Sequence, residues 1–131
     1  MTARVLIIDD EQALCWSLER ALRSFGFEVA SAGDTQSAYF LLADAAFDAV
    51  LLDLRLKHVM GDAFYLTLVH QWPYLRGRVI LMSGDPWPGR EEWPPELKAC
   101  PLLVKPFPLD TLRGLLAGIV RPEVRKQNGG A

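Results

Sequence analysis

The feature that most constrains this chain is a short apolar run that ends on a carboxylate. Val50, Leu51 and Leu52 would be buried on both faces, and Asp53 follows them directly. A strand that is apolar on both faces is typical of the centre of a parallel sheet that helices cover on each side. Asp53 would then lie at the carboxyl end of that strand, which is where open α/β sheets bind their ligands.

Short apolar runs of the same kind alternate with amphipathic helical patterns along the chain. Further strands are predicted at Arg4–Ile8, Phe27–Ala32, Val79–Met82 and Leu102–Val104. Helices are predicted at Gln12–Phe25, from Asp34 or Thr35 to about Ala45, from the end of a loop over Leu54–Gly61 to about Trp72, and over Leu109–Ile119. Because strand and helix alternate, right-handed crossovers would build a parallel sheet with helices on both faces.

Length and composition indicate one soluble α/β domain. The chain has 131 residues, of which 50% are hydrophobic and 23% are charged, and it is long enough to bury a sizeable core. We assign residues 1–122 to this domain. Residues 123–131 follow Pro122 with almost nothing apolar to bury, so we expect a flexible C-terminal tail there.

Charge and cysteine usage limit the partners and the compartment. A formal net charge of -2 argues against direct binding of nucleic acid, which needs a basic face. The spacing of Cys15 and Cys100 suits neither a metal site nor a disulfide framework, and reduced thiols are typical of the cytoplasm. No apolar run approaches the ~20 residues of a membrane span. We therefore expect a cytoplasmic protein with no membrane partner.

Side chains that carry chemistry follow four of the five predicted strands. They are Asp9 and Asp10, then Asp53, then Ser83, and finally Lys105. The fold would gather them at one edge of the sheet. Carboxylates held together repel one another, and Mg²⁺ relieves this repulsion by binding one or two carboxylates with waters and phosphate oxygens. The lysine would pair with the carboxylates at rest and with phosphoryl oxygens later.

The same residues, in this order, resemble the receiver domain of two-component response regulators. The resemblance covers residues 4–120 and rests on Asp9-Asp10, Asp53 with Gly61 after its loop, Ser83-Gly84, and Lys105-Pro106-Phe107. It implies a flavodoxin-like, doubly wound, five-stranded sheet of order 2-1-3-4-5. It also implies a cis peptide bond before Pro106. Taken alone, the acid pair would more often cap a helix, Ser83 would be a turn residue and Lys105 a solvated one.

The resemblance also implies a role for each site residue. Asp53 would be the phosphoacceptor. Asp10, Asp53 and the backbone carbonyl of Arg55 would bind Mg²⁺, and Asp9 would act through a bound water. Ser83 and Lys105 would contact the phosphoryl group. Arg55 and Asp85 would flank the path of the hydrolytic water, so a contact between them would lengthen the life of the phosphorylated state.

Three departures from the family pattern distinguish this chain. A loop position that usually holds proline is Lys57, and a position that usually holds an aromatic residue is Leu102, which excludes an aromatic rotamer switch there. The segment Asp85–Cys100, where a receiver carries its fourth helix, is rich in proline, so we predict a disrupted fourth helix with at most a short turn at Arg90–Trp93 or Pro95–Ala99. Its two tryptophans, Trp87 and Trp93, would either cover the sheet or anchor a partner.

The sequence thus predicts a phosphoacceptor module of a two-component phosphorelay. The donor would be a histidine kinase or a histidine phosphotransfer protein, and an output protein would bind the result. The module would catalyse only its own phosphorylation and dephosphorylation, as a monomer or weak dimer. A phospho-independent interaction module on the same fold, and a receiver cut from a larger regulator, remain alternatives to a single-domain receiver. A dehalogenase-type phosphatase would need an aspartate where Arg55 stands.

Overall fold

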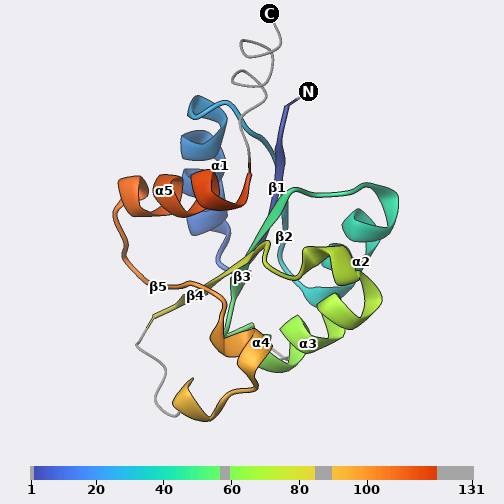
Figure 1. Ribbon diagram of the computed structural model, residues 1–131. Coiled ribbons are helices and arrows are strands. Elements are labelled where there is room, and N and C mark those ends of the chain that lie inside the picture. The colour runs from blue at the N-terminus through green and yellow to red at the C-terminus, as the bar shows by residue number, and fades with distance from the viewer. Residues whose placement is uncertain (1, 57–59, 85–89, 121–131) are drawn as a thin grey trace, which may run out of the picture.

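A single sheet of five parallel strands in the order β2-β1-β3-β4-β5 organises the protein (Figure 1). The computed structural model describes residues 2–56, 60–84 and 90–120. The strands are β1 (Arg4–Ile8), β2 (Glu28–Ala32), β3 (Ala49–Asp53), β4 (Val79–Ser83) and β5 (Leu102–Val104). The strand order that the resemblance implied is therefore confirmed, and so are the five predicted strands. β1 and β5 have the predicted ends, and β2 and β4 each differ from the prediction by one residue at one end.

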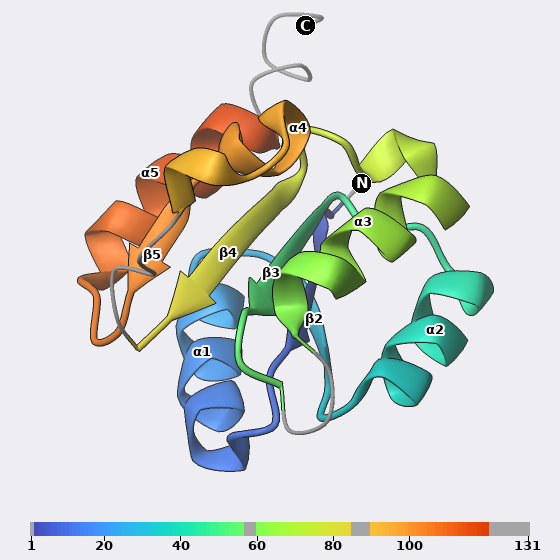
Figure 2. The ribbon, with the colours of Figure 1, turned by 90° about the horizontal axis from the view of Figure 1, so that it is seen from below.

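Helices cover both faces of the sheet (Figures 1 and 2). On one face lie α1 (Gln12–Ser24) and α5 (Leu109–Ile119), and on the other lie α2 (Thr35–Asp44), α3 (Gly61–Gln71) and the short α4 (Pro95–Lys98). Every residue of β3 and β4 is buried, because each side chain of a central strand meets one helical layer or the other. Two apolar cores, one on each face, therefore hold β3 in the middle of the molecule.

Local sequence signals set the helix ends. Asp34 caps α2 by accepting a hydrogen bond of 2.7 Å from the Ser37 N–H, which satisfies a backbone donor that the helix itself cannot. Gly26 follows α1 at a φ of 98°, a conformation that glycine adopts without steric cost. Pro73 begins a 3-10 turn directly after α3. The predicted helix ends at Phe25, Ala45 and Trp72 were one residue too late, since each of these residues is a C-cap.

The fourth helix is disrupted, as the prolines predicted. The described part of the segment holds a 3-10 turn at Arg90–Glu92 and the four residues of α4, with Pro95 at the first position of α4, where proline is tolerated. Trp93 is partly buried against the core beneath α2, α3 and α4. Trp93 therefore covers the sheet, whereas Trp87 lies outside the described residues.

Several expectations concern residues that the structure does not describe. The domain boundary at residue 122, the tail 123–131, the loop position Lys57 and the rim residue Asp85 all fall outside 2–56, 60–84 and 90–120. Within those ranges, none of the helices has both the length and the apolar character needed to cross a membrane. The peptide bond between Lys105 and Pro106 is cis, as the resemblance implied.

Candidate functional site

Parallel pairing brings the predicted site residues to one edge of the sheet. The register aligns Ile8 with Leu52, Asp53 with Met82, and Ser83 with Val104. Because the strands run in the same direction, their carboxyl ends finish at almost the same level. The four segments that follow β1, β3, β4 and β5 therefore meet although they are far apart in the chain.

Three carboxylates form the acidic part of the site. Asp9, Asp10 and Asp53 each offer an oxygen, and these oxygens lie within 4.8 Å of one another. Asp9 and Asp53 are buried, with exposures of 1% and 5%, whereas Asp10 is exposed to solvent. Two buried anions and one exposed anion repel one another. Such a pocket of hard oxygen ligands, open on the side of Asp10, fits a divalent cation such as Mg²⁺.

Lys105 supplies the positive charge of the site. Its Nζ donates a hydrogen bond of 2.8 Å to Asp9 Oδ2 and lies 3.6 Å from Asp53 Oδ1. Burial alone would lower the pKa of the Lys105 ammonium, but its hydrogen bond to Asp9 and the surrounding carboxylates raise the pKa above its ordinary value. Lys105 is therefore a permanent cation at neutral pH, and it is bound more closely to Asp9 than to Asp53.

The carboxyl of Asp53 is held in an unfavourable electrostatic environment. Burial first, and then the negative charge of Asp9, raise the pKa of Asp53 above its ordinary value. The Lys105 ammonium and the hydrogen bond from the Arg55 N–H, at 3.3 Å, offset only part of this rise. Ionised Asp53 thus carries charge that its surroundings do not fully compensate, so a cation bound at the pocket would stabilise the ionised form.

Backbone hydrogen bonds fix the frame around these side chains. Ser83, which ends β4 and is completely buried, accepts a hydrogen bond of 2.7 Å from the Lys105 N–H through its backbone carbonyl. Asp9 Oδ1 accepts one of 2.9 Å from the Glu11 N–H. The site therefore contains Ser83 where the sequence placed it. The predicted contribution of the Arg55 carbonyl to metal binding, and the contact of Arg55 with Asp85, stay predictions.

Gly61 lets the loop after β3 return against the end of that strand. Its N–H donates a hydrogen bond of 2.8 Å to the Leu54 carbonyl. A Cβ at this position would lie 2.5 Å from the Asp53 carbonyl oxygen and 2.5 Å from Leu54 Cα, which is far inside van der Waals contact. Glycine is therefore required here for close approach of two backbone segments, and the segment that it approaches carries Asp53.

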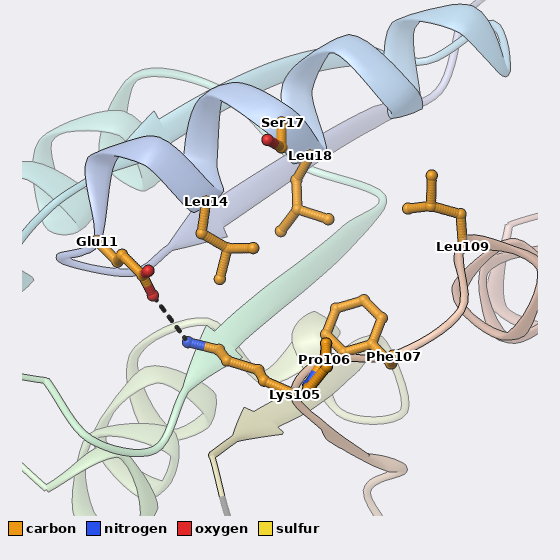
Figure 3. Close-up of a pocket in the computed structure, with 8 residues that line it drawn as sticks. All are labelled: Glu11, Leu14, Ser17, Leu18, Lys105, Pro106, Phe107 and Leu109. Atoms are coloured by element: carbon orange, nitrogen blue, oxygen red, sulfur yellow. Dashed lines mark ion pairs between the residues drawn. The ribbon is translucent and has the colours of Figure 1, made fainter.

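A groove opens beside Lys105, between α1 and the segment that follows β5 (Figure 3). Its volume is about 490 Å³, and it is lined by Glu11, Leu14, Ser17, Leu18, Lys105, Pro106, Phe107 and Leu109. The Glu11 carboxylate points toward the Lys105 ammonium at one end of the groove, at 4.0 Å. Neither Glu11 nor the groove was predicted. The sequence feature that could have indicated Glu11 was its position directly after Asp9 and Asp10.

Comparison with known sequences identifies relatives over nearly the whole chain. Residues 5–117 match the response regulator receiver domain. The chain is 32% identical over 123 residues to the alginate biosynthesis transcriptional regulatory protein AlgB of Pseudomonas aeruginosa, a match that covers 94% of this chain and 26% of that protein. It is 33% identical over 136 aligned positions to the regulatory protein AtoC of Escherichia coli, a match that covers 95% of this chain and 28% of that protein. The chain spans about a quarter of the length of these curated relatives.

Comparison with solved structures finds the same architecture. The chemotaxis protein CheY4 of Vibrio cholerae matches with a TM-score of 0.81 and 25% identity, over 92% of this chain and 100% of that chain. The response regulator TrrA of Thermotoga maritima, solved in complex with Mg²⁺-BeF, matches with a TM-score of 0.77 and 20% identity, over 91% and 100%. These likenesses agree with the sheet order and the helical layers described above.

Proposed function

The chain belongs to the family of response regulator receiver domains, and we propose that it accepts a phosphoryl group from a phosphohistidine onto Asp53 in the presence of Mg²⁺. One observation carries this proposal. The Lys105 ammonium lies 3.6 Å from Asp53 Oδ1, at the edge of a pocket in which three carboxylates offer oxygens within 4.8 Å of one another. A nucleophilic carboxylate, a cation and a divalent-metal pocket are the groups that phosphoryl transfer to an aspartate needs.

In the proposed reaction, an oxygen of the ionised Asp53 carboxylate attacks the phosphorus of the donor's phosphohistidine. A P–O bond forms, the P–N bond breaks, and the imidazole leaves with its electron pair and takes up a proton from water. The new acyl phosphate carries its negative charge on oxygens within reach of Lys105, and the Ser83 hydroxyl would donate a hydrogen bond to one of them. Bound Mg²⁺ would neutralise charge on the same oxygens.

The three carboxylates have different parts in this scheme. Asp10 and Asp53, with the carbonyl of Arg55, would hold the metal, and Asp9 would act through a bound water. Asp9 also holds Lys105 by its 2.8 Å hydrogen bond. TrrA, a protein of the same fold, was solved in complex with Mg²⁺-BeF, which is consistent with divalent metal binding by this fold.

Receiver domains of response regulators interact with histidine kinases and with output domains. For this chain we propose a histidine kinase or phosphotransfer protein as the donor, an output protein or domain as the responder, and the cytoplasm as the compartment. Catalysis would be confined to the protein's own phosphorylation and dephosphorylation, because the nucleophile itself is the group that is modified.

The test is incubation with a small-molecule phosphodonor and Mg²⁺, followed by measurement of the intact mass. The wild type should gain one phosphoryl group, Asp53→Asn should gain none, and Asp10→Asn should gain it more slowly because its metal site is weakened. Asp44→Asn, at the exposed end of α2, is the matched control and should behave as the wild type. Equal phosphorylation of Asp53→Asn would show that another residue is the phosphoacceptor, and no gain in any variant would favour a phospho-independent interaction module.

A further inference from the structure

Lys105 contacts a third carboxylate that does not belong to the buried pocket. Glu11 Oε1 lies 4.0 Å from Lys105 Nζ, and the Glu11 side chain is 63% exposed, whereas the side chain of Asp9 has no exposure. Figure 3 shows the Glu11 carboxylate directed at the ammonium from the end of the groove. The lysine is therefore attracted from two sides, inward by the buried pair Asp9 and Asp53 and outward by Glu11.

The backbone of Glu11 is fixed by the same residue that holds the lysine. Asp9 Oδ1 accepts the Glu11 N–H at 2.9 Å, and Asp9 Oδ2 accepts Lys105 Nζ at 2.8 Å. The Glu11 carbonyl accepts the N–H of Cys15 at 3.1 Å. Although Glu11 is the N-cap residue of α1, its side chain makes no capping hydrogen bond. Its carboxylate is thus available to the lysine while its main chain is held in place.

We propose that Glu11 is a positioning residue that holds the Lys105 ammonium away from Asp53 and competes with phosphoryl oxygens for it. This inference rests on the proposed function. When Asp53 carries a phosphoryl group, its oxygens attract the ammonium inward, and the attraction of Glu11 opposes that movement. Because Glu11 is exposed, its attraction is partly screened by solvent. Exposed ion pairs of this kind change an equilibrium by about two- to fivefold.

The variant that tests the proposal is Glu11→Gln, which removes the charge and keeps the shape of the side chain. The probe is beryllofluoride, a stable mimic of the phosphoryl group, titrated at saturating Mg²⁺ and followed by fluorine NMR. At the lowest ionic strength that the Mg²⁺ and fluoride allow, the variant should bind the probe about two- to fivefold more tightly than the wild type. The difference should vanish near 1 M salt, where the screening length falls to about 3 Å.

Two controls separate this role from a general effect of charge. Asp110→Asn removes another acid, from the first turn of α5, and should leave the affinity unchanged. In a Lys105→Met background, Glu11→Gln should give no gain, because Glu11 is proposed to act through the lysine. The proposal would be overturned if Glu11→Gln raised the affinity for beryllofluoride equally in both backgrounds. It would also be overturned if Glu11→Gln gave no gain, or a loss, of affinity at low salt in the native background.

A spectroscopic measurement tests the contact without any phosphoryl group. The chain has the four lysines Lys57, Lys98, Lys105 and Lys126, so labelled lysine side chains can be resolved and Lys105 assigned with Lys105→Arg. The ε-methylene signal of Lys105 should move in Glu11→Gln and stay in place in Asp110→Asn. A signal that does not move would refute the inference. Failure of the wild type to bind beryllofluoride would instead count against the proposed function, and the lysine signal would then decide the inference alone.

Discussion

Replacing Gly61 by alanine should destabilise the protein by forcing apart two backbone segments at the phosphoacceptor. The new Cβ would lie 2.5 Å from both the Asp53 carbonyl oxygen and Leu54 Cα, and 3.1 Å from the Leu54 carbonyl carbon. Ordinary contact begins near 3.5 Å, so the segments must separate by about 1 Å. The atoms that would have to move belong to backbone at the end of β3, where Asp53 and Leu54 are buried.

The magnitude follows from two losses. Overpacking of a buried contact costs about 1–3 kcal/mol. The hydrogen bond of 2.8 Å from the Gly61 N–H to the Leu54 carbonyl would be stretched, which costs about 1 kcal/mol. We therefore expect the free energy of unfolding to fall by about 2–4 kcal/mol, the two losses together. For a domain of this size, that corresponds to a Tm lowered by roughly 8–16 °C.

The assay is urea denaturation and a thermal melt of Gly61→Ala beside the matched control Gly114→Ala. A Cβ at Gly114, within α5, meets nothing within 4 Å. The control should therefore be stabilised, by up to about 1 kcal/mol, because alanine favours the helix. The inference that a Cβ at position 61 forces the two backbone segments apart would be refuted if Gly61→Ala were as stable as the wild type. It would also be refuted if Gly114→Ala lost as much stability as Gly61→Ala.

Two further predictions use the pKa shifts of buried groups. The raised pKa of Asp53 means that the folded state disfavours its ionised form, so without Mg²⁺ this group contributes stability at low pH that is lost as pH rises above its ordinary pKa. Asp53→Asn should therefore melt at a higher temperature than the wild type at pH 7, and added Mg²⁺ should reduce the difference. A Tm of Asp53→Asn below that of the wild type at pH 7 without Mg²⁺ would contradict this prediction. Burial, reinforced by Asp9, raises the pKa of the Cys15 thiol from 9.0 to about 11, so stability should decline between these pH values as the unfolded thiol ionises. Cys15→Ala should flatten that decline, and an unchanged slope would show that the thiol does not cause it.

Much of the fold was predictable because its signals are local. The apolar run of β3, the helix period of α1 and the capping residue Asp34 each act over a few neighbouring residues, so the sequence placed the elements to within one or two positions. The prolines between β4 and β5 predicted a disrupted helix for the same reason, since each proline removes a hydrogen bond within its own turn. The strand order was different, because it came from the resemblance to a known family.

The sequence predicted most of the site residues and the pairing of Lys105 with carboxylates, but it predicted neither Glu11 nor the individual distances. Parallel strands finish at one edge, so the residues after them must gather there, and Asp9, Asp53, Ser83 and Lys105 do so. The alternative interpretation of the acid pair as a helix cap agrees with the structure in part. The Asp9 carboxylate accepts a hydrogen bond from the N–H of Glu11, which is the N-cap residue of α1.

The sequence by itself determined which residues end the strands, and therefore which chemistry collects at the edge of the sheet. Only the tertiary structure decided that Lys105 hydrogen-bonds Asp9 at 2.8 Å while it lies 3.6 Å from Asp53, that Glu11 approaches the same ammonium, and that Gly61 has no room for a Cβ. Lys105 and Asp9 are 96 residues apart, and differences of about 1 Å between such partners depend on strand register and on how each helix packs against the sheet. No local pattern encodes those distances, because they arise only when the two apolar cores close on β3.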